Sequence, residues 1–213
     1  MTRTSTLPHL RLLVGALAAS TALISLSACA PIIIGSAMVG GTMMVTDRRT
    51  SGTQIEDQAI ELKVLSRVKE AVAERGHINV TSYNRLVLIT GEVPTEADKL
   101  AVEQSIARIE NVRSIVNELA VSGSASLTSR SNDTLLTSKV NASFVDARDV
   151  LSNSFKVVTE RGTVYLMGRV TEREATRASD LARSVSGVQK VVRVFELLSE
   201  AELTQMTPKA AAK

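Results

Sequence analysis

Few side chains in this sequence could perform acid–base or nucleophilic catalysis. Two carboxylate pairs, Glu56 with Asp57 and Glu172 with Glu174, have the chemistry of a general acid and a general base. Both pairs stand where we expect helices to begin, and acidic side chains there stabilise the helix dipole, which favours a structural role. The chain has one cysteine and two histidines, of which His77 lies in an expected turn, too few for a zinc cluster. We therefore expect no catalytic residues, no metal site, no cofactor and no enzymatic activity.

The surroundings of the one cysteine, Cys29, indicate covalent lipid attachment. Basic residues precede an uncharged apolar run from Leu12 to Leu26, as in a secretory signal peptide. The run ends in Leu26-Ser27-Ala28-Cys29, which resembles the bacterial lipobox, where the signal is cut before a cysteine that is then acylated. We therefore expect residues 1–28 to be removed, and Cys29 to carry diacylglycerol on its thiol and a further acyl chain, such as palmitate, on its amino group.

The residues around Cys29 also bear on cellular location. Ala30 follows the cysteine, where an aspartate would favour retention in the inner membrane, so we expect an outer-membrane lipoprotein that faces the periplasm. Residues 29–52 are first small and apolar and then polar, which is typical of a flexible tether. An uncleaved membrane-spanning helix is the alternative, because Leu12 to Thr46 carries no charge and is long enough. Pro31 and three nearby glycines interrupt such a helix and favour the lipoprotein interpretation.

Composition excludes several other classes of protein. The charged fraction of 22% is too high for a polytopic membrane protein. The net charge of +3 falls nearly to zero once the two arginines of the signal peptide are removed. Aromatic residues make up 2% of the chain and there is no Trp, so stacking platforms for single-stranded nucleic acid are missing. We therefore expect no nucleic-acid partner.

The rest of the chain contains an internal repeat. Residues Asp57–Val64 correspond to Asp133–Val140, and Leu86–Val93 correspond to Thr163–Val170. A Ser/Gly-rich run over 123–131 separates the copies and has the composition of a flexible linker. We therefore predict two small domains, residues 53–122 and 132–200, followed by a disordered tail over 201–213.

Each copy has the same predicted order of elements, αββαβ. A first helix begins at a capping signal, Thr53-x-x-Glu56 in the first copy and Asn132 or Asp133 in the second. Two β-rich runs joined by a polar turn predict a hairpin. A second helix and a last strand follow, at 95–109 and 112–121 in the first copy and at 172–185 and 188–197 in the second. The fold class is therefore α+β, with two helices on one face of a three-stranded sheet in each of two tandem domains.

Each copy has Gly-x-Val at the end of the hairpin, in Gly91–Val93 and Gly168–Val170, and the second copy has Gly187-Val188 before its last strand. With the αββαβ order, these motifs make the paired units resemble the BON domain of bacterial envelope proteins. The first copy has Asn111 in place of that glycine, and asparagine also tolerates a left-handed turn. Paired BON domains behind a lipobox imply a non-catalytic outer-membrane lipoprotein that binds phospholipid and supports envelope integrity.

The first helix of the second copy has an apolar face that a three-stranded domain cannot bury. At about 100° per residue, one side of this helix points to the core, and these residues are Leu136, Val140 and Phe144. The other side holds our candidate lipid-binding residues, Leu135, Lys139, Ala142 and Val145. The first copy has Ala59, Ser66 and Lys69 at the positions of the three apolar ones. Members of the resembled family have Trp where this chain has Leu135, so we expect the apolar contact without the aromatic anchor.

Two interpretations of this face stay open at this stage. In one, it packs against the other domain or the linker. In the other, it enters a lipid headgroup region while Lys139 extends to phosphate. Residues 161–193 hold seven basic and three acidic side chains, which suits anionic phospholipid such as phosphatidylglycerol, although Glu–Arg pairs on a solvated helix would account for most of them. A periplasmic adaptor for outer-membrane assembly proteins is the alternative function.

Overall fold

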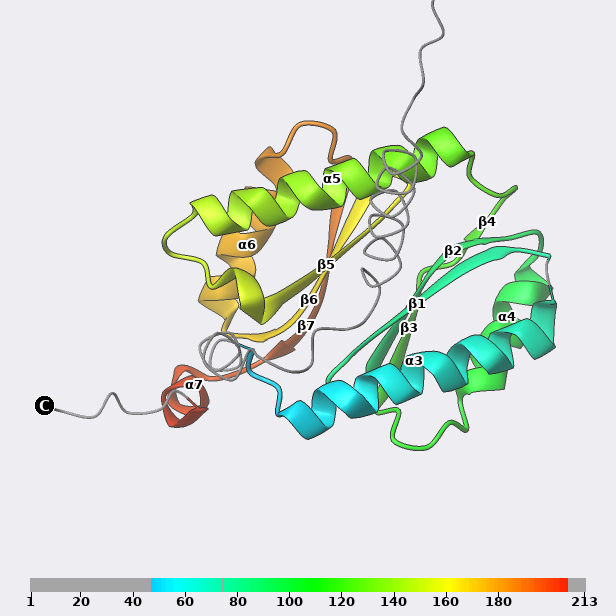
Figure 1. The fold of residues 1–213 in the computed structure, drawn as a ribbon, viewed down its shortest axis with the longest axis horizontal. Coiled ribbons are helices and arrows are strands. Elements are labelled where there is room, and N and C mark those ends of the chain that lie inside the picture. Colours follow the sequence, from blue (N-terminus) through cyan, green and yellow to red (C-terminus); the bar gives the residue numbers. More distant parts are fainter. Residues whose placement is uncertain (1–46, 74, 207–213) are drawn as a thin grey trace, which may run out of the picture. The chain divides into compact units, whose positions relative to one another are not determined.

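The computed structural model describes residues 47–73 and 75–206. The predicted signal peptide, Cys29 and the tether up to residue 46 lie outside the described residues. The first repeat has the order helix, hairpin, helix, strand (Figure 1). Its elements are α3 (Ser51–Val72), β1 (His77–Tyr83), β2 (Leu86–Val93), α4 (Glu96–Ile106), β3 (Ser114–Asn117) and β4 (Ala120–Val121).

The second repeat has the same order and one additional helix at its end. Its elements are α5 (Leu127–Asp146), β5 (Phe155–Glu160), β6 (Thr163–Val170), α6 (Glu172–Ser184), β7 (Lys190–Leu197) and α7 (Glu200–Met206). A single turn of 3₁₀-helix, Ser152–Ser154, precedes β5. The αββαβ order predicted from the sequence is confirmed in both repeats.

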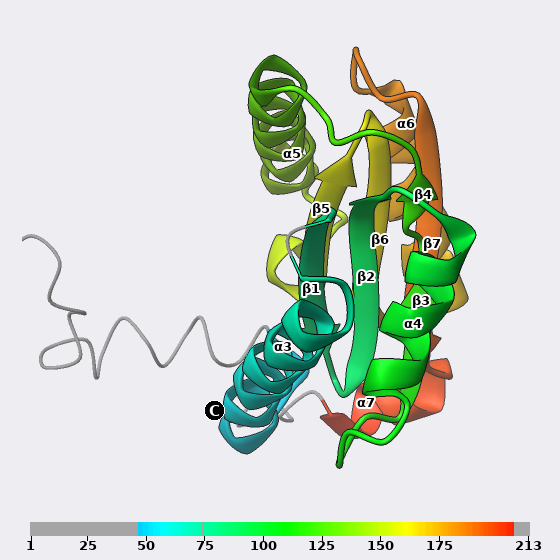
Figure 2. The same ribbon diagram turned by 90° about the vertical axis from the view of Figure 1, so that its right-hand side faces the viewer.

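Each repeat forms a sheet in which the middle strand pairs with both others. In the second repeat β6 is antiparallel to β5 and parallel to β7. In the first, β2 is antiparallel to β1 and parallel to β3, and the predicted last strand is divided, because β4 resumes the pairing with β2 only at Ala120. Figure 2 shows α3 and α4 covering one face of the first sheet. The parallel pairs require a crossover, and α4 and α6 provide it.

Apolar side chains of helices and sheet form a separate core in each repeat. In the first, Ile60 and Val64 of α3 pack with Val87 and Ile89 of β2. In the second, Val140 and Phe144 of α5 pack with strand residues that include Phe155, whose ring lies 5.4 Å from that of Phe144. The helical phase predicted from the sequence is confirmed, since Leu136, Val140 and Phe144 are buried.

The first helices begin earlier than the sequence predicted. Thr50 caps α3 by accepting a hydrogen bond from the Thr53 backbone N–H, and Ser126 caps α5 through Ser129 in the same way. The predicted caps, Thr53 with Glu56 in the first copy and Asn132 or Asp133 in the second, are therefore wrong. Thr171 does form a complete capping box with Glu174 at the start of α6, so the interpretation of the second carboxylate pair as helix-stabilising is confirmed.

The buried carboxylates of Asp57 and Asp133 connect the first helix of each repeat to its hairpin turn. Asp133 accepts hydrogen bonds of 2.9 Å from the backbone N–H groups of Arg161 and Gly162. Asp57 accepts 2.8 Å bonds from the backbone N–H groups at the corresponding turn and a 2.7 Å bond from the Ser82 hydroxyl. Repetition of this contact explains why an aspartate stands at the same place in both copies.

Two further expectations are corrected at the ends of the second repeat. The predicted linker over 123–131 is flexible in composition, yet α5 takes up its last five residues. The tail was predicted to be disordered from residue 201, but residues up to Met206 belong to helix α7. Residues 207–213 lie outside the described part. The left-handed turn expected at Asn111 is confirmed, with φ of 68°, and Gly187 has φ of 103° at the corresponding position.

The two repeats meet through their sheets. Tyr83 and Leu88 of the first repeat share an apolar cluster with Tyr165, Met167 and Val194 of the second. Burial raises the pKa of both tyrosine hydroxyls to about 12. The apolar contact between the repeats therefore comes from the sheet faces that the helices leave open.

Residues 47–49 contact both repeats at this junction. Arg48 binds both carboxylate oxygens of Glu174 at 2.7 and 2.8 Å and donates to the Arg169 carbonyl at 2.7 Å. The next residue, Arg49, binds Asp57 at 3.0 Å and stacks 4.1 Å from the centre of the Tyr83 ring. Adjacent arginines thus fix the start of the described chain to both repeats.

Candidate membrane-contact site

Helix α5 presents the four residues predicted from the sequence on its solvent side. Leu135 is 60% exposed and Val145 is 71% exposed, and Lys139 and Ala142 are exposed as well. The neighbouring Leu136 is only 7% exposed. The change from buried to exposed over one residue follows from the 100° step of the helix. The geometric expectation for these residues is therefore confirmed, and their contact with lipid stays a prediction.

The structure adds Leu127 to this outward face. Its side chain is 79% exposed and lies in the first turn of α5, in the segment that the sequence assigned to the linker. The hydroxyls of Thr134 and Ser138, which stand between the apolar residues, donate to the carbonyls of Arg130 and Thr134 at 3.0 Å. Since these donors are already satisfied within the helix, the face can meet an apolar phase at low cost. We call Leu127, Leu135, Lys139, Ala142 and Val145 the α5 face.

No described residue covers the α5 face. The first interpretation, in which it packs against the other domain or the linker, is therefore wrong for the described part of the chain. The reason is that the apolar faces of the sheets supply the contact between the repeats and leave the helices outside.

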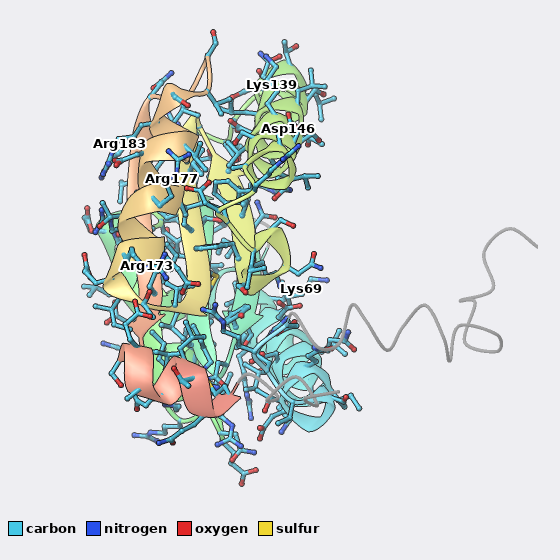
Figure 3. All side chains as sticks on the ribbon, turned by 90° about the vertical axis from the view of Figure 1, so that its left-hand side faces the viewer. Lys69, Lys139, Asp146, Arg173, Arg177 and Arg183 are labelled. Carbon is cyan, nitrogen blue, oxygen red and sulfur yellow. The ribbon has the colours of Figure 1, made fainter. Side chains whose placement is uncertain are left out.

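A groove of about 570 Å³ runs beside the α5 face. Leu135 and Lys139 line one side, and the β5–β6 turn and the loop before β7 line the other through Gly162 and Gly187. Lys139 forms no ion pair with any described residue, and Figure 3 shows it on α5, which ends at Asp146. The ammonium group is thus available to a phosphate beside the apolar residues.

The basic surplus in residues 161–193 is largely compensated. Arg177 binds Asp149 at 2.7 Å, and Arg169 binds Glu196 at 3.2 Å, so the partners lie outside the counted segment. Arg173, Arg183 and Arg193 also form ion pairs, and Figure 3 shows Arg173, Arg177 and Arg183 on α6. The prediction that ion pairs engage most of these arginines is confirmed. Their number therefore supports anionic-lipid binding less than the sequence count suggested.

Helix α3 also exposes apolar side chains, which the sequence comparison missed. Ile55 is 69% exposed and Leu62 is 70% exposed. The corresponding positions in α5 are Ser131 and Ser138, so the apolar residues of the two helices do not align. A comparison restricted to the positions of the α5 face could not find them, whereas marking every apolar residue opposite the core side of α3 would have done so.

A polar hollow of 150 Å³ lies among β1, β5 and α5. Glu160 accepts a 2.8 Å hydrogen bond from the Asn79 amide, and burial raises the pKa of its carboxyl group above the ordinary value. His77, expected in a turn, is the first residue of β1 and lines this hollow, with its Nε2 3.3 Å from the Asn79 amide nitrogen. These groups join one repeat to the other.

Comparisons with known proteins agree with the repeat structure. The BON domain family matches residues 56–123 and 132–198, that is, both repeats. No helix in the described residues combines the length and the apolar character needed to cross a bilayer.

Three curated relatives match most of the chain. Outer membrane lipoprotein DolP of Haemophilus influenzae is 39% identical over 180 residues, which cover 83% of this chain and 92% of that protein. The 21 kDa hemolysin of Actinobacillus pleuropneumoniae is 33% identical over 70% of this chain and 78% of its own length. Osmotically-inducible protein Y of Escherichia coli is 28% identical over 66% of this chain and 72% of its own length.

Proposed function

Because this chain belongs to the BON domain family and is a homologue of an outer-membrane lipoprotein, we propose that its second domain binds anionic phospholipid through the α5 face. The anchor is the acylated Cys29, which holds the protein at the outer membrane with both domains in the periplasm. The protein supports outer-membrane integrity without catalysing a reaction.

The observation that carries this proposal is the composition of the α5 face. Leu127, Leu135 and Val145 are exposed along one side of the helix, and the hydroxyls of Thr134 and Ser138 on this side donate to carbonyls of the helix itself. Burying a side chain of this kind contributes roughly 1.5–3 kcal/mol when it is complete, and burial in a headgroup region is partial. The face therefore supplies weak, reversible adhesion, which suits a protein that its acyl chains already hold at the membrane.

Charge adds selectivity to this adhesion. Each lysine or arginine near an anionic surface contributes about 1 kcal/mol, and Lys139 is the basic member of the α5 face. Asp146 at the end of the helix opposes it. We therefore expect a modest preference for phosphatidylglycerol over zwitterionic lipid, and this preference should weaken as salt increases.

Vesicle co-sedimentation tests the proposal. The chain from residue 29 onward with Cys29→Ser cannot be acylated, so any binding comes from the polypeptide itself, which includes the apolar residues 30–45. The loss of binding in a variant of the α5 face then measures the share of that face. We expect it to sediment with vesicles that contain phosphatidylglycerol, less with phosphatidylcholine alone, and less at high salt. Leu135→Glu should weaken binding, and Asn141→Glu, which adds the same charge at an exposed position of α5 outside the α5 face, is the matched control.

The competing function is a periplasmic adaptor whose α5 face meets a protein of the outer-membrane assembly machinery. It predicts no dependence of binding on lipid charge or salt. Failure of the unacylated chain to sediment with any vesicle would overturn the lipid proposal and favour the adaptor.

A further inference from the structure

The apolar stripe of α3 has no role in the function proposed above. Ile55, Ala59, Leu62 and Ser66 follow one another on the solvent side of the helix and are all exposed. At about 100° per residue they fall within an arc of roughly 60°, and at 1.5 Å per residue the arc runs for about 16 Å. The stripe therefore presents two large apolar side chains, Ile55 and Leu62, about 11 Å apart along the helix, with the small Ala59 and Ser66 between and after them.

Lysines border this stripe on both sides. Lys63 stands about 100° from Leu62 on one side, and Lys69 lies on the opposite border. Both are exposed, and neither forms an ion pair with a described residue. The exposed and half-buried acidic residues of the same helix are each paired: Glu56 with an arginine, Glu61 with a lysine, and Glu70 with Arg67 at 3.1 Å. Apolar residues flanked by free lysines complement a bilayer with anionic headgroups, because lysine can extend to phosphate while the apolar side chains enter.

The position of α3 in the chain also favours a bilayer as its partner. The helix begins four residues after Asp47, where the described part starts, and residues 30–46 connect that point to Cys29. These residues reach at most about 60 Å when fully extended. A short tether gives an effective concentration in the millimolar range, so a stripe with weak intrinsic affinity is sufficient.

The stripe also lies on a favourable side of the molecule. Figure 3 shows Lys69 of α3 and Lys139 of α5 on the side away from α6, which carries Arg173, Arg177 and Arg183. A contact through α3 therefore does not compete with one through the α5 face.

We propose that the α3 stripe is a second bilayer contact, specific for a surface with anionic lipid, which the first BON domain makes in addition to the α5 face. This inference rests on the proposed function, because it assumes that the protein is held at a membrane. It assigns the first domain a role at the lipid surface as well as in the contact between the repeats.

An environment-sensitive fluorophore on a single cysteine tests this contact directly. In the unacylated chain from residue 29 with Cys29→Ser, a cysteine can be introduced at Leu62, at Leu135 or, as a control, at the exposed Thr176 of α6. We expect a blue shift of the emission at positions 62 and 135 on vesicles containing phosphatidylglycerol, and none at position 176. Ile55→Glu should lower the vesicle partition coefficient roughly three- to tenfold, whereas Gln58→Glu, the same charge added beside the stripe, should change it less than twofold.

The outcomes separate the two proposals. A blue shift at position 135 without one at position 62 overturns the second contact and leaves the α5 face in place. Equal effects of Ile55→Glu and Gln58→Glu would indicate charge repulsion alone and would also overturn it. Absence of binding to any vesicle would overturn both. The Ile55→Glu protein must also keep its melting temperature, so that weaker binding is not caused by unfolding. We expect this because the Ile55 side chain is exposed.

Discussion

Adjacent leucines of α5 should respond in opposite ways to substitution. Leu135 is 60% exposed, so less than half of its side-chain transfer energy is at stake, and Leu135→Glu should cost at most about 1 kcal/mol. The introduced carboxylate stands four residues before Lys139, and such a pair returns about 0.3–0.5 kcal/mol. The melting temperature should therefore fall by less than about 4 °C.

Leu136 is 7% exposed and lies on the buried side of α5, at the floor of the groove beside the α5 face. Leu136→Ala should cost about 2–5 kcal/mol through lost transfer energy and the cavity that remains. Leu136→Glu should cost more, because an unpaired carboxylate would then be buried. Thermal unfolding followed by circular dichroism measures the stability of each variant, and vesicle co-sedimentation measures its binding.

The two substitutions should affect stability and vesicle binding separately. We expect Leu135→Glu to bind vesicles about tenfold more weakly with nearly unchanged stability, and Leu136→Ala to lose stability while its folded fraction binds normally. Equal losses of stability would refute the helical phase. A stable Leu135→Glu protein that binds as tightly as the unaltered chain would refute the assignment of lipid contact to the α5 face.

Three further predictions concern buried polar contacts. Asp133→Asn keeps the shape but leaves one acceptor oxygen for two backbone N–H groups of the β5–β6 turn, so one hydrogen bond is lost; it should cost about 1–3 kcal/mol and speed amide exchange in that turn. Burial raises the pKa of Glu160, so ionisation of this carboxyl group destabilises the fold as pH rises. Glu160→Gln should therefore raise the free energy of unfolding at pH 7. Urea titrations should show that this increase vanishes below pH 4.5. Burial opposes ionisation of Glu174, but Arg48 holds the pKa of Glu174 below its ordinary value. The ion pair therefore stabilises the folded state above pH 4.5, and this stabilisation is lost on acidification. Arg48→Ala should flatten the fall in stability between about pH 5 and pH 3.

Local patterns were sufficient to predict much of the fold. The spacing of Leu136, Val140 and Phe144 defines a helix face, and the hairpins follow from alternating β-rich runs around polar turns. Where the first helices begin was less predictable. The polar run before Asp133 has the composition of a linker, and only tertiary packing of α5 extends the helix back to its cap at Ser126.

The candidate site was predictable where it depends on one helix and not where it depends on contacts between elements. The exposure of Leu135 and Val145 follows from helical phase alone. The pairing of Arg177 with Asp149 joins α6 to a loop that the sequence cannot place beside it. The outward side of α3 was missed because Ile55 and Leu62 occupy positions that hold serine in the other repeat. A count of charges does not show which side chains form ion pairs, and an alignment of the repeats does not show apolar residues present in one copy alone.

The most direct test of the central claim is a residue-by-residue map of the bilayer contact. Backbone amide signals of the unacylated chain can be recorded by NMR with bicelles that contain phosphatidylglycerol and a spin-labelled lipid. We expect the strongest paramagnetic broadening along α5 at Leu127, Leu135, Ala142 and Val145, with weaker effects at Leu136 and Phe144 on the buried side. Broadening centred on α6, or broadening that is uniform over both domains, would contradict the assignment of lipid binding to the α5 face.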